Sequence, residues 1–375
     1  MTGRVLFDQG PLPGGTLFQN LRGLIRADHP DEVEPALARI DAAQLEGFWL
    51  AGYFSYELGH ALTPRLHHLM PRDRAMPLIL MGIFDAPIQA PPLPEDAGVR
   101  IDTPRPLWSR QQYDAAIDAV RQYIEAGDCY QINLTFPMQA QTVGDPLAIY
   151  AALARRQPVG EGAFVDLGGP VVLSRSPEVF FSIDTDRRIT TRPMKGTMPR
   201  GATPAEDHAM QQALAASEKN RAENLMIVDL LRNDISRVCQ PGSVQVPHLF
   251  QVETYATVLQ MTSTVTGQLR DDAGLPEILT ALFPCGSITG APKIRAMEII
   301  AELEQRPRDI YCGAIGWMDP AGSMRFNVAI RSPVLDAAGV LHIQVGGGIV
   351  HDSESGPEWE EALCKSAFLN LSPKG

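Results

Sequence analysis

One lysine lies in a run of residues that constrains the backbone on both sides of it. Pro193 stands two residues before Lys195, and Gly196 follows it directly. Proline fixes φ, whereas glycine reaches backbone conformations that are closed to other residues. A lysine with its ordinary pKa of about 10.4 is protonated at neutral pH, so it becomes a nucleophile only where its surroundings free the amine. The run fits either a turn with a solvated lysine or a lysine that reaches a ligand.

Carboxylates that could act with this lysine occur in three places. Glu178 ends the segment 174–178, where it is either a proton-exchanging group or a solvated residue at a strand end. Glu223 falls early in one expected helix, and Glu358 and Glu361 are spaced i, i+3 on another. That spacing puts two carboxylates on one face of a helix, where both can approach one hard cation. Taken alone, such glutamates usually face solvent.

Two glycine-rich segments could bring backbone close to a ligand. The segment 286–290 leads into an expected helix with Pro292 near its first turn, and free N–H groups at a helix start attract anions. Its spacing does not match a Walker loop. The three consecutive glycines at 346–348 likewise permit close approach. Both segments fit tight turns between strands equally well.

The composition narrows the classes of protein. Of 375 residues, 45% are hydrophobic and 20% are charged, which is typical of a globular protein. The net charge of −12 argues against a nucleic-acid partner, although a few local cations can still bind an anionic substrate. We find no apolar window long enough for a membrane span and no secretory leader, and we expect a cytoplasmic protein. The five cysteines form no CxxC pair, which argues against a zinc site or a disulfide framework.

The order of the expected elements indicates an α+β fold. A proline-rich stretch, 86–106, is typical of an extended connector. We therefore divide the chain into an N-terminal portion, 1–106, and a core, 107–375, packed together as one structural unit. Strands are expected at 48–56, 76–84, 131–136, 163–166, 171–174, 180–183, 188–192, 258–269, 310–318, 324–334 and 341–346. Helices are expected between a cap at Ser109 and an end at Gly127, and at 220–231, 293–304 and 358–369.

Six motifs, taken in order, resemble those of the chorismate-utilising enzymes. They are Asp128–Leu134 (DCYQINL), Ser174–Glu178 (SRSPE), Arg192–Thr197 (RPMKGT), Arg221–Asp234 (RAENLMIVDLLRND), Gly286–Lys293 (GSITGAPK) and Gly346–Val350 (GGGIV). The resemblance runs from about Tyr113 to Phe368. Within this family the chain is most similar to the branch called aminodeoxychorismate synthase component I. Each motif alone is weak, but six in this order are very specific.

The resemblance implies two facing, mainly antiparallel β-sheets with helices packed outside and an active site in the cleft. It also implies an enzyme that converts chorismate to 4-amino-4-deoxychorismate, for 4-aminobenzoate and folate synthesis. In such enzymes the lysine matching Lys195 attacks C2 of chorismate and displaces the 4-hydroxyl. Ammonia then adds at C4 and expels the lysine, and Glu178 matches the acid–base partner.

The remaining ligands also follow from the resemblance. Mg2+ would be held by Glu223, Glu361 and Glu358 and would bridge to the ring carboxylate of chorismate. Substrate-binding positions carried over from the family are Gly196, Thr197, Ser287, Thr289, Gly290, Tyr311, Arg331, Gly346, Gly347, Gly348 and Lys365. We find no Gly-flanked cysteine nucleophile with a downstream His–Glu pair, so ammonia would come from a separate glutamine amidotransferase subunit.

Three residues depart from the commoner family pattern. Met194 stands where an isoleucine is usual, Asn220 where an acidic residue is frequent, and Gln260 where relatives commonly carry a histidine. We expect the first to alter packing and the second to weaken the outer metal shell. Because glutamine cannot exchange a proton near neutral pH, the third would leave proton delivery to Glu178 or Lys195.

Two other functions stay open. Anthranilate synthase component I usually has a small residue at the position of Lys195, and isochorismate and salicylate synthases use a lysine at that of Gln131. The pair present here therefore favours 4-amination over these siblings. A non-catalytic chorismate-binding protein is the alternative outside the class; the retention of Lys195 with Glu223 and Glu361 argues against it.

Overall fold

The computed structural model describes residues 3–95, 98–255 and 258–371. Its strands form two sheets whose pairings are antiparallel. The first sheet runs in the order β17 (Gly290–Ala291), β9 (Gln131–Val143), β21 (Val340–Ile349), β20 (Val334–Leu335), β11 (Val171–Ser176), β10 (Glu161–Asp166), β1 (Arg4–Phe7), β2 (Thr16–Phe18) and β6 (Ile88–Gln89), while β7 (Arg100–Ile101) and β8 (Arg105–Pro106) pair with β9.

The second sheet gathers strands from both ends of the chain. Its order is β14 (Met194–Pro199), β16 (Val258–Gln268), β13 (Arg188–Thr191), β12 (Val179–Ile183), β19 (Met324–Val328), β18 (Ala314–Met318), β4 (Trp49–Phe54), β5 (Ile79–Phe84) and β3 (Gly23–Ala27), while β15 (Gln245–Thr254) pairs with β16. Strands from the first 106 residues thus lie in both sheets. The division of the chain at residue 106 stays a prediction.

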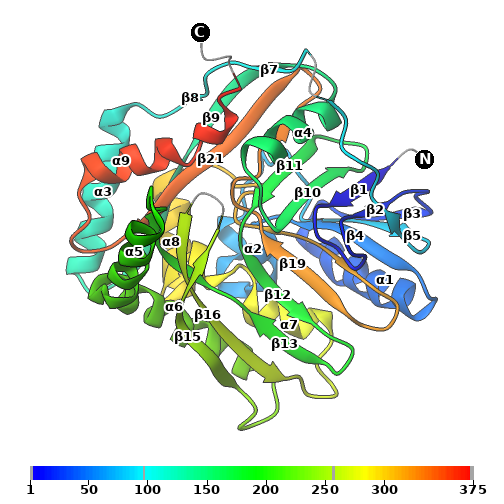
Figure 1. Cartoon of the computed structure of the whole chain (residues 1–375). Coiled ribbons are helices and arrows are strands. Elements are labelled where there is room, and N and C mark those ends of the chain that lie inside the picture. The colour runs from blue at the N-terminus through cyan, green and yellow to red at the C-terminus, as the bar shows by residue number, and fades with distance from the viewer. Residues whose placement is uncertain (1–2, 96–97, 256–257, 372–375) are drawn as a thin grey trace.

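The two sheets pack face to face across one apolar cluster. Strand β4 illustrates how alternation builds this arrangement, because successive side chains of a strand point to opposite faces. Ala51 and Tyr53 lie in the cluster between the sheets, whereas Leu50 and Phe54 lie in the cluster on the outer face. The predicted architecture, α+β with two facing antiparallel sheets and helices outside, is confirmed (Figure 1).

Helices cover the outer face of each sheet. Those on the first sheet are α3 (Arg110–Glu125), α4 (Pro146–Arg156), α8 (Lys293–Glu304) and α9 (Ser355–Cys364). Those on the second are α1 (Val33–Leu45), α2 (Leu58–Leu62), α6 (Glu218–Ser236) and α7 (Leu275–Leu282), while α5 (Pro204–Ala216) packs against β16 through Leu214. None of the helices in the described ranges is both long enough and apolar enough to cross a membrane.

The chain passes from one sheet to the other at two places that matter for the site. Between β11 and β12 it crosses at Pro177 and Glu178, and between β19 and β20 it crosses at residues 329–333. Backbone hydrogen bonds join the crossings, since the Val328 N–H donates to the Glu178 carbonyl and the Arg175 N–H donates to the Arg331 carbonyl. Each crossing therefore places one chemically useful side chain between the sheets.

The second crossing also explains an error in the predicted strands. The strand expected at 324–334 is two strands, β19 and β20, in different sheets. Arg331 has a φ of 50°, in the left-handed region, and Pro333 has no N–H to donate, so neither continues a ladder. The strand expected at 310–318 starts only at Ala314, because Ile310 and its neighbours form turns.

Other expected elements keep their place with shifted ends. The helix at 293–304 is found with those bounds, and Ser109 caps α3 as expected. The helix expected at 220–231 extends from Glu218 to Ser236, and the last helix ends at Cys364, before a 3-10 turn. The proline-rich connector includes β6, β7 and β8, which pair with strands of the first sheet.

A buried ion pair joins the first sheet to the segments behind the site. The Arg308 guanidinium donates to Glu304 Oε2 at 2.9 Å and to Oε1 at 2.7 Å. It also donates to the carbonyls of Asn133 and Ile288, and Glu304 accepts from the N–H and hydroxyl of Thr135. Both charged residues are at most 5% exposed. Removing one partner would leave an uncompensated buried charge.

We therefore predict that Arg308→Met lowers the free energy of unfolding by about 3–5 kcal/mol. The measurement is a urea titration followed by fluorescence. Arg232→Met is the matched control, because Arg232 pairs with Asp229 one helical turn away but both side chains are more than half exposed. Its loss should cost less than about 1 kcal/mol. Equal effects of the two substitutions would contradict a structural role for the buried pair.

Candidate active site

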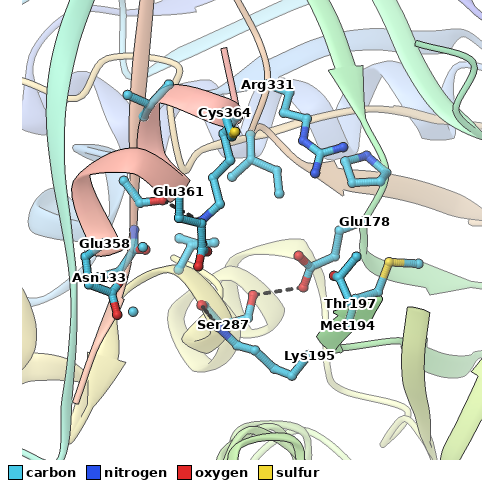
Figure 2. Close-up of a pocket in the computed structure, with 18 of the residues that line it drawn as sticks. Asn133, Glu178, Met194, Lys195, Thr197, Ser287, Arg331, Glu358, Glu361 and Cys364 are labelled. Carbon is cyan, nitrogen blue, oxygen red and sulfur yellow. Dashed lines mark hydrogen bonds and ion pairs between the residues drawn. The ribbon is translucent and has the colours of Figure 1, made fainter. Parts of the chain in front are cut away.

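A cavity of about 980 Å3 opens between the sheets where the chain crosses. Its walls come from β9, β14 and β21, from α6 and α9, and from the 3-10 turn at 286–288. The predicted site residues that line it are Glu178, Lys195, Gly196, Thr197, Glu223, Ser287, Tyr311, Arg331, Gly346, Gly347, Gly348, Glu358, Glu361 and Lys365. Figure 2 shows Glu178 and Lys195 beside Ser287, with the carboxylates of α9 on the other side of the cavity.

Two predicted substrate-binding residues do not line this cavity. The Thr289 hydroxyl donates to the carbonyls of Cys285 and Gly286, and the residue is fully buried. Gly290 lies against β9, so close that an added Cβ would meet the Gln131 carbonyl at 2.1 Å. Both residues therefore lie behind the cavity wall, and their predicted role in substrate binding stays a prediction.

Lys195 reaches the cavity because β14 bulges at this residue. Met194 pairs with Thr262 and Thr197 pairs with Gln260, so two residues of β14 face the single position between them on β16. Gly196 has a φ of 87°, which favours glycine. The half-buried Lys195 side chain donates from Nζ to the Ser287 carbonyl at 3.4 Å.

Glu178 faces the same space from the first crossing between the sheets. The side chain is buried, and Ser287 Oγ donates to its Oε1 at 2.9 Å. Burial raises the pKa of Glu178 to about 7, although the Lys195 ammonium and the Ser287 hydroxyl both favour the carboxylate. Loss of hydration outweighs these partners.

The pKa of Lys195 moves in the opposite direction. Burial lowers it, because the loss of hydration disfavours the ammonium more than the Glu178 charge supports it, and Lys365 adds to the lowering. The two groups therefore approach each other in proton affinity. Transfer of one proton from Lys195 to Glu178 would create a neutral amine and a carboxylic acid at once, which are a nucleophile and a proton donor.

Cationic groups stand where an anionic substrate could bind. Arg331, at the second crossing, interacts with the Glu178 charge. Lys365 Nζ donates to the Gly346 carbonyl at 2.8 Å and lies 2.8 Å from Glu361 Oε1. Tyr311 lines the cavity as well, and the buried Arg308 guanidinium, which is paired with Glu304, lies behind its ring. Guanidinium and ammonium groups of this kind recognise carboxylates.

The α9 carboxylates converge over bare backbone. A Cβ added to Gly347 would lie 3.3 Å from Glu358 Oε2, 3.4 Å from Lys365 Nζ and 4.0 Å from Glu361 Oε1. Burial raises the pKa of Glu358. Burial also disfavours ionisation of Glu361, but the Lys365 ammonium outweighs it, so the pKa of Glu361 is lowered. Oxygen donors of this kind fit a hard divalent cation.

The third predicted metal ligand stands apart from these two. Glu223 lies on α6, near enough to Lys195 to favour its ammonium, and we find no hydrogen-bond partner for it among the described residues. Across the described ranges, no cluster of three or more His, Cys, Asp or Glu residues could hold a metal ion as it stands. Asn220 lines the cavity, and its side chain donates to the Ser217 hydroxyl at the start of α6.

Two cavity-lining cations were missed in the sequence. Lys219 lies one turn before Glu223, so helical spacing could have drawn attention to it. Its Nζ lies 3.8 Å from Asp352. Arg156 ends α4 and has no local pattern that distinguishes it from the neighbouring arginine.

Comparison with known proteins identifies the family. The chain is 48% identical over 260 residues to an aminodeoxychorismate synthase of Streptomyces griseus, which covers 69% of this chain and 36% of that protein. It is 40% identical over 342 residues to aminodeoxychorismate synthase component 1 of Klebsiella aerogenes, covering 84% and 74%. The chain thus spans about a third of the first relative and about three quarters of the second.

The fold is also that of solved relatives. The structure superposes on anthranilate synthase component I of Streptococcus pneumoniae with a TM-score of 0.78 at 25% identity, covering 98% of this chain and 92% of that one. The family described as chorismate binding enzyme matches residues 15–370. The chain therefore belongs to the chorismate binding enzyme family.

Proposed function

We propose that this chain is an aminodeoxychorismate synthase that replaces the 4-hydroxyl of chorismate with an amino group. The observation that carries the proposal is that Lys195 and Glu178 lie in one cavity wall, where Ser287 contacts both. A protein that only binds chorismate would gain nothing from this pair, since burial disfavours both the Lys195 ammonium and the Glu178 carboxylate. The relatives named aminodeoxychorismate synthase support the same reaction.

The proposed chemistry uses the pair twice. The neutral Lys195 amine forms a bond to C2 of chorismate, both conjugated ring double bonds shift by one position, and the C4–O bond breaks; Glu178 gives its proton to the departing hydroxyl, which leaves as water. Glu178 then takes a proton from the alkylated nitrogen. Ammonia next forms a bond to C4, both double bonds shift back, and the C2–N bond breaks as Glu178 returns its proton to the departing Lys195 nitrogen. Glu178 then takes a proton from the new ammonium group, so both residues regain their starting form. The net reaction consumes ammonia and produces water.

We propose Mg2+ as the cofactor, held by Glu358 and Glu361 together with Glu223, which lines the same cavity. The convergence of two α9 carboxylates over Gly347 supports this set. A divalent cation there would neutralise a substrate carboxylate that the protein's own glutamates repel. In this structure the Lys365 ammonium is paired with Glu361. If a cation bound Glu361 instead, the ammonium would be free to bind substrate.

We further propose that ammonia comes from a separate glutamine amidotransferase subunit. The Klebsiella relative is named component 1, a name that supports a second component. No glutaminase pattern was found in the sequence. The reaction is expected in the cytoplasm.

Product identification tests the proposal. Purified chain with chorismate, Mg2+ and an ammonium salt should form 4-amino-4-deoxychorismate, detected by liquid chromatography with mass spectrometry. Lys195→Ala should lower turnover by more than about 1,000-fold, because the nucleophile is lost. Lys219→Ala is the matched control, as this second lysine lines the same cavity but contacts neither Glu178 nor Ser287 in the described structure. It should retain turnover within about tenfold.

The other outcomes of this assay are informative. Anthranilate as the product would assign the chain to the sibling enzyme. Chorismate binding without turnover from any ammonia source would favour the non-catalytic alternative. EDTA should suppress the reaction and Mg2+ should restore it; a reaction insensitive to chelation would remove the proposed metal.

The pH dependence tests the role of Glu178. Because the acid form must donate a proton, kcat/KM for chorismate should fall as pH rises through about 7. Ser287→Ala removes a hydrogen bond that favours the carboxylate, which raises the pKa of Glu178 further. The alkaline limb should therefore move to higher pH, by about one pH unit. The measurement is made at a constant concentration of unprotonated ammonia.

Thr289→Val is the control for this shift. It alters the same turn, but the Thr289 hydroxyl contacts backbone carbonyls and not Glu178. The alkaline limb of kcat/KM in Thr289→Val should lie at the same pH as in the unmodified protein, even if kcat/KM itself falls. A limb that moves to lower pH in Ser287→Ala would contradict the assignment of Glu178 as the acid.

A further inference from the structure

The bulge that turns Lys195 into the cavity leaves backbone groups without ladder partners. Lys195 and Gly196 together face one residue of β16, Met261, so the regular alternation of hydrogen bonds is broken there. Before the bulge, the strand is anchored by the backbone, since the Ser263 N–H donates to the Pro193 carbonyl at 3.2 Å. After the bulge, the backbone register resumes only at Thr197. The residues between these anchors need another support.

One side chain of β16 supplies that support. Gln260 Nε2 donates to the Gly196 carbonyl at 2.9 Å, and Gln260 Oε1 accepts from the Thr197 hydroxyl at 2.7 Å. The two bonds hold both residues that follow Lys195. A primary amide is suited to this place because it donates and accepts at the same time.

The opposite side of the bulge is closed by helix α6. A Cβ added to Gly196 would lie 2.9 Å from the side chain of Asn220. The bulge is therefore held between α6 on one side and Gln260 on the other. Gln260 is half-buried in the cavity wall, and its amide does not titrate, so it cannot exchange a proton with substrate.

We propose that Gln260 is a positioning residue for Lys195, which fixes the direction of the lysine by bracing Gly196 and Thr197. Its effect on turnover rests on the proposed function, because there Lys195 is the nucleophile. Its effect on Lys195 itself rests only on the geometry. A methionine of similar length at this position would fill the space but would make neither hydrogen bond.

The direct test measures Lys195 without turnover. Wild-type protein and Gln260→Met are exposed to a trace of an amine-acylating reagent at a series of pH values, and acylation of the Lys195 peptide is quantified by mass spectrometry. In the wild type the midpoint should lie below that of an ordinary lysine. In Gln260→Met it should rise towards the ordinary value, because an unbraced lysine moves towards water. An unchanged midpoint would overturn the proposal.

Two further variants make the test specific. Thr197→Val removes one of the two bonds and should raise the midpoint by a smaller amount; it also serves if Gln260→Met does not fold. Gln251→Met changes an exposed glutamine on β15, for whose side chain we find no hydrogen bond among the described residues, and should leave the midpoint unchanged. A shift in Gln251→Met as large as in Gln260→Met would overturn the proposal.

Kinetics then separate positioning from binding. Gln260→Met should lower kcat by about 100-fold while KM for chorismate changes less than about threefold, since misplacement of a nucleophile acts on the chemical step. A rise in KM with kcat unchanged would overturn the positioning role. If the product proved to be anthranilate, the proposed function would fail, but the acylation midpoints would still decide the role of Gln260.

Discussion

The structure depends on a cavity wall where a lysine and a glutamate both contact Ser287 and are both partly or fully withdrawn from water. In water these groups would both be charged, and the amine would be inert. Here burial raises the pKa of Glu178 to about 7 and lowers that of Lys195, so the ionic pair loses much of its advantage over the neutral one. Ser287 contacts both members and fixes their geometry. The remaining features of the site serve to hold this pair in place.

The fold provides three supports for it. Glu178 stands where the chain crosses from the first sheet to the second, so two sheets fix its backbone. Lys195 stands on a bulge braced by Gln260. Behind Ser287, the Arg308 guanidinium binds the Ile288 carbonyl and joins that turn to β9. Each support satisfies backbone groups that a regular sheet would have paired, which is why irregular backbone is tolerated in a buried wall.

The sequence predicted best the elements that have both a strong period and clear ends. Helix α8 was expected at the bounds it has, because its apolar positions recur at helical spacing after Pro292. Helix α5 was not expected, since only Leu214 of it is buried and no apolar stripe marks it. Strand β14 was also missed, because the bulge at Lys195 breaks its alternation.

The same limits apply to the site. Fourteen of the residues predicted from motif order and residue type line one cavity. Most of them have side chains or bare backbone suited to contact with a ligand. Thr289 and Gly290 do not line the cavity, because only the three-dimensional path decides which side of the turn a residue takes; their role in substrate binding stays a prediction. The crossing of the chain between sheets left no local signal either, because it depends on which sheet each strand joins.

The most direct measurement is rapid-quench mass spectrometry of the protein mixed with chorismate and Mg2+ in the absence of ammonia. The account predicts a transient mass increase equal to chorismate less one water, located by peptide mapping on Lys195. A protein that forms 4-amino-4-deoxychorismate when ammonia is added, yet never carries that mass on Lys195, would contradict the account.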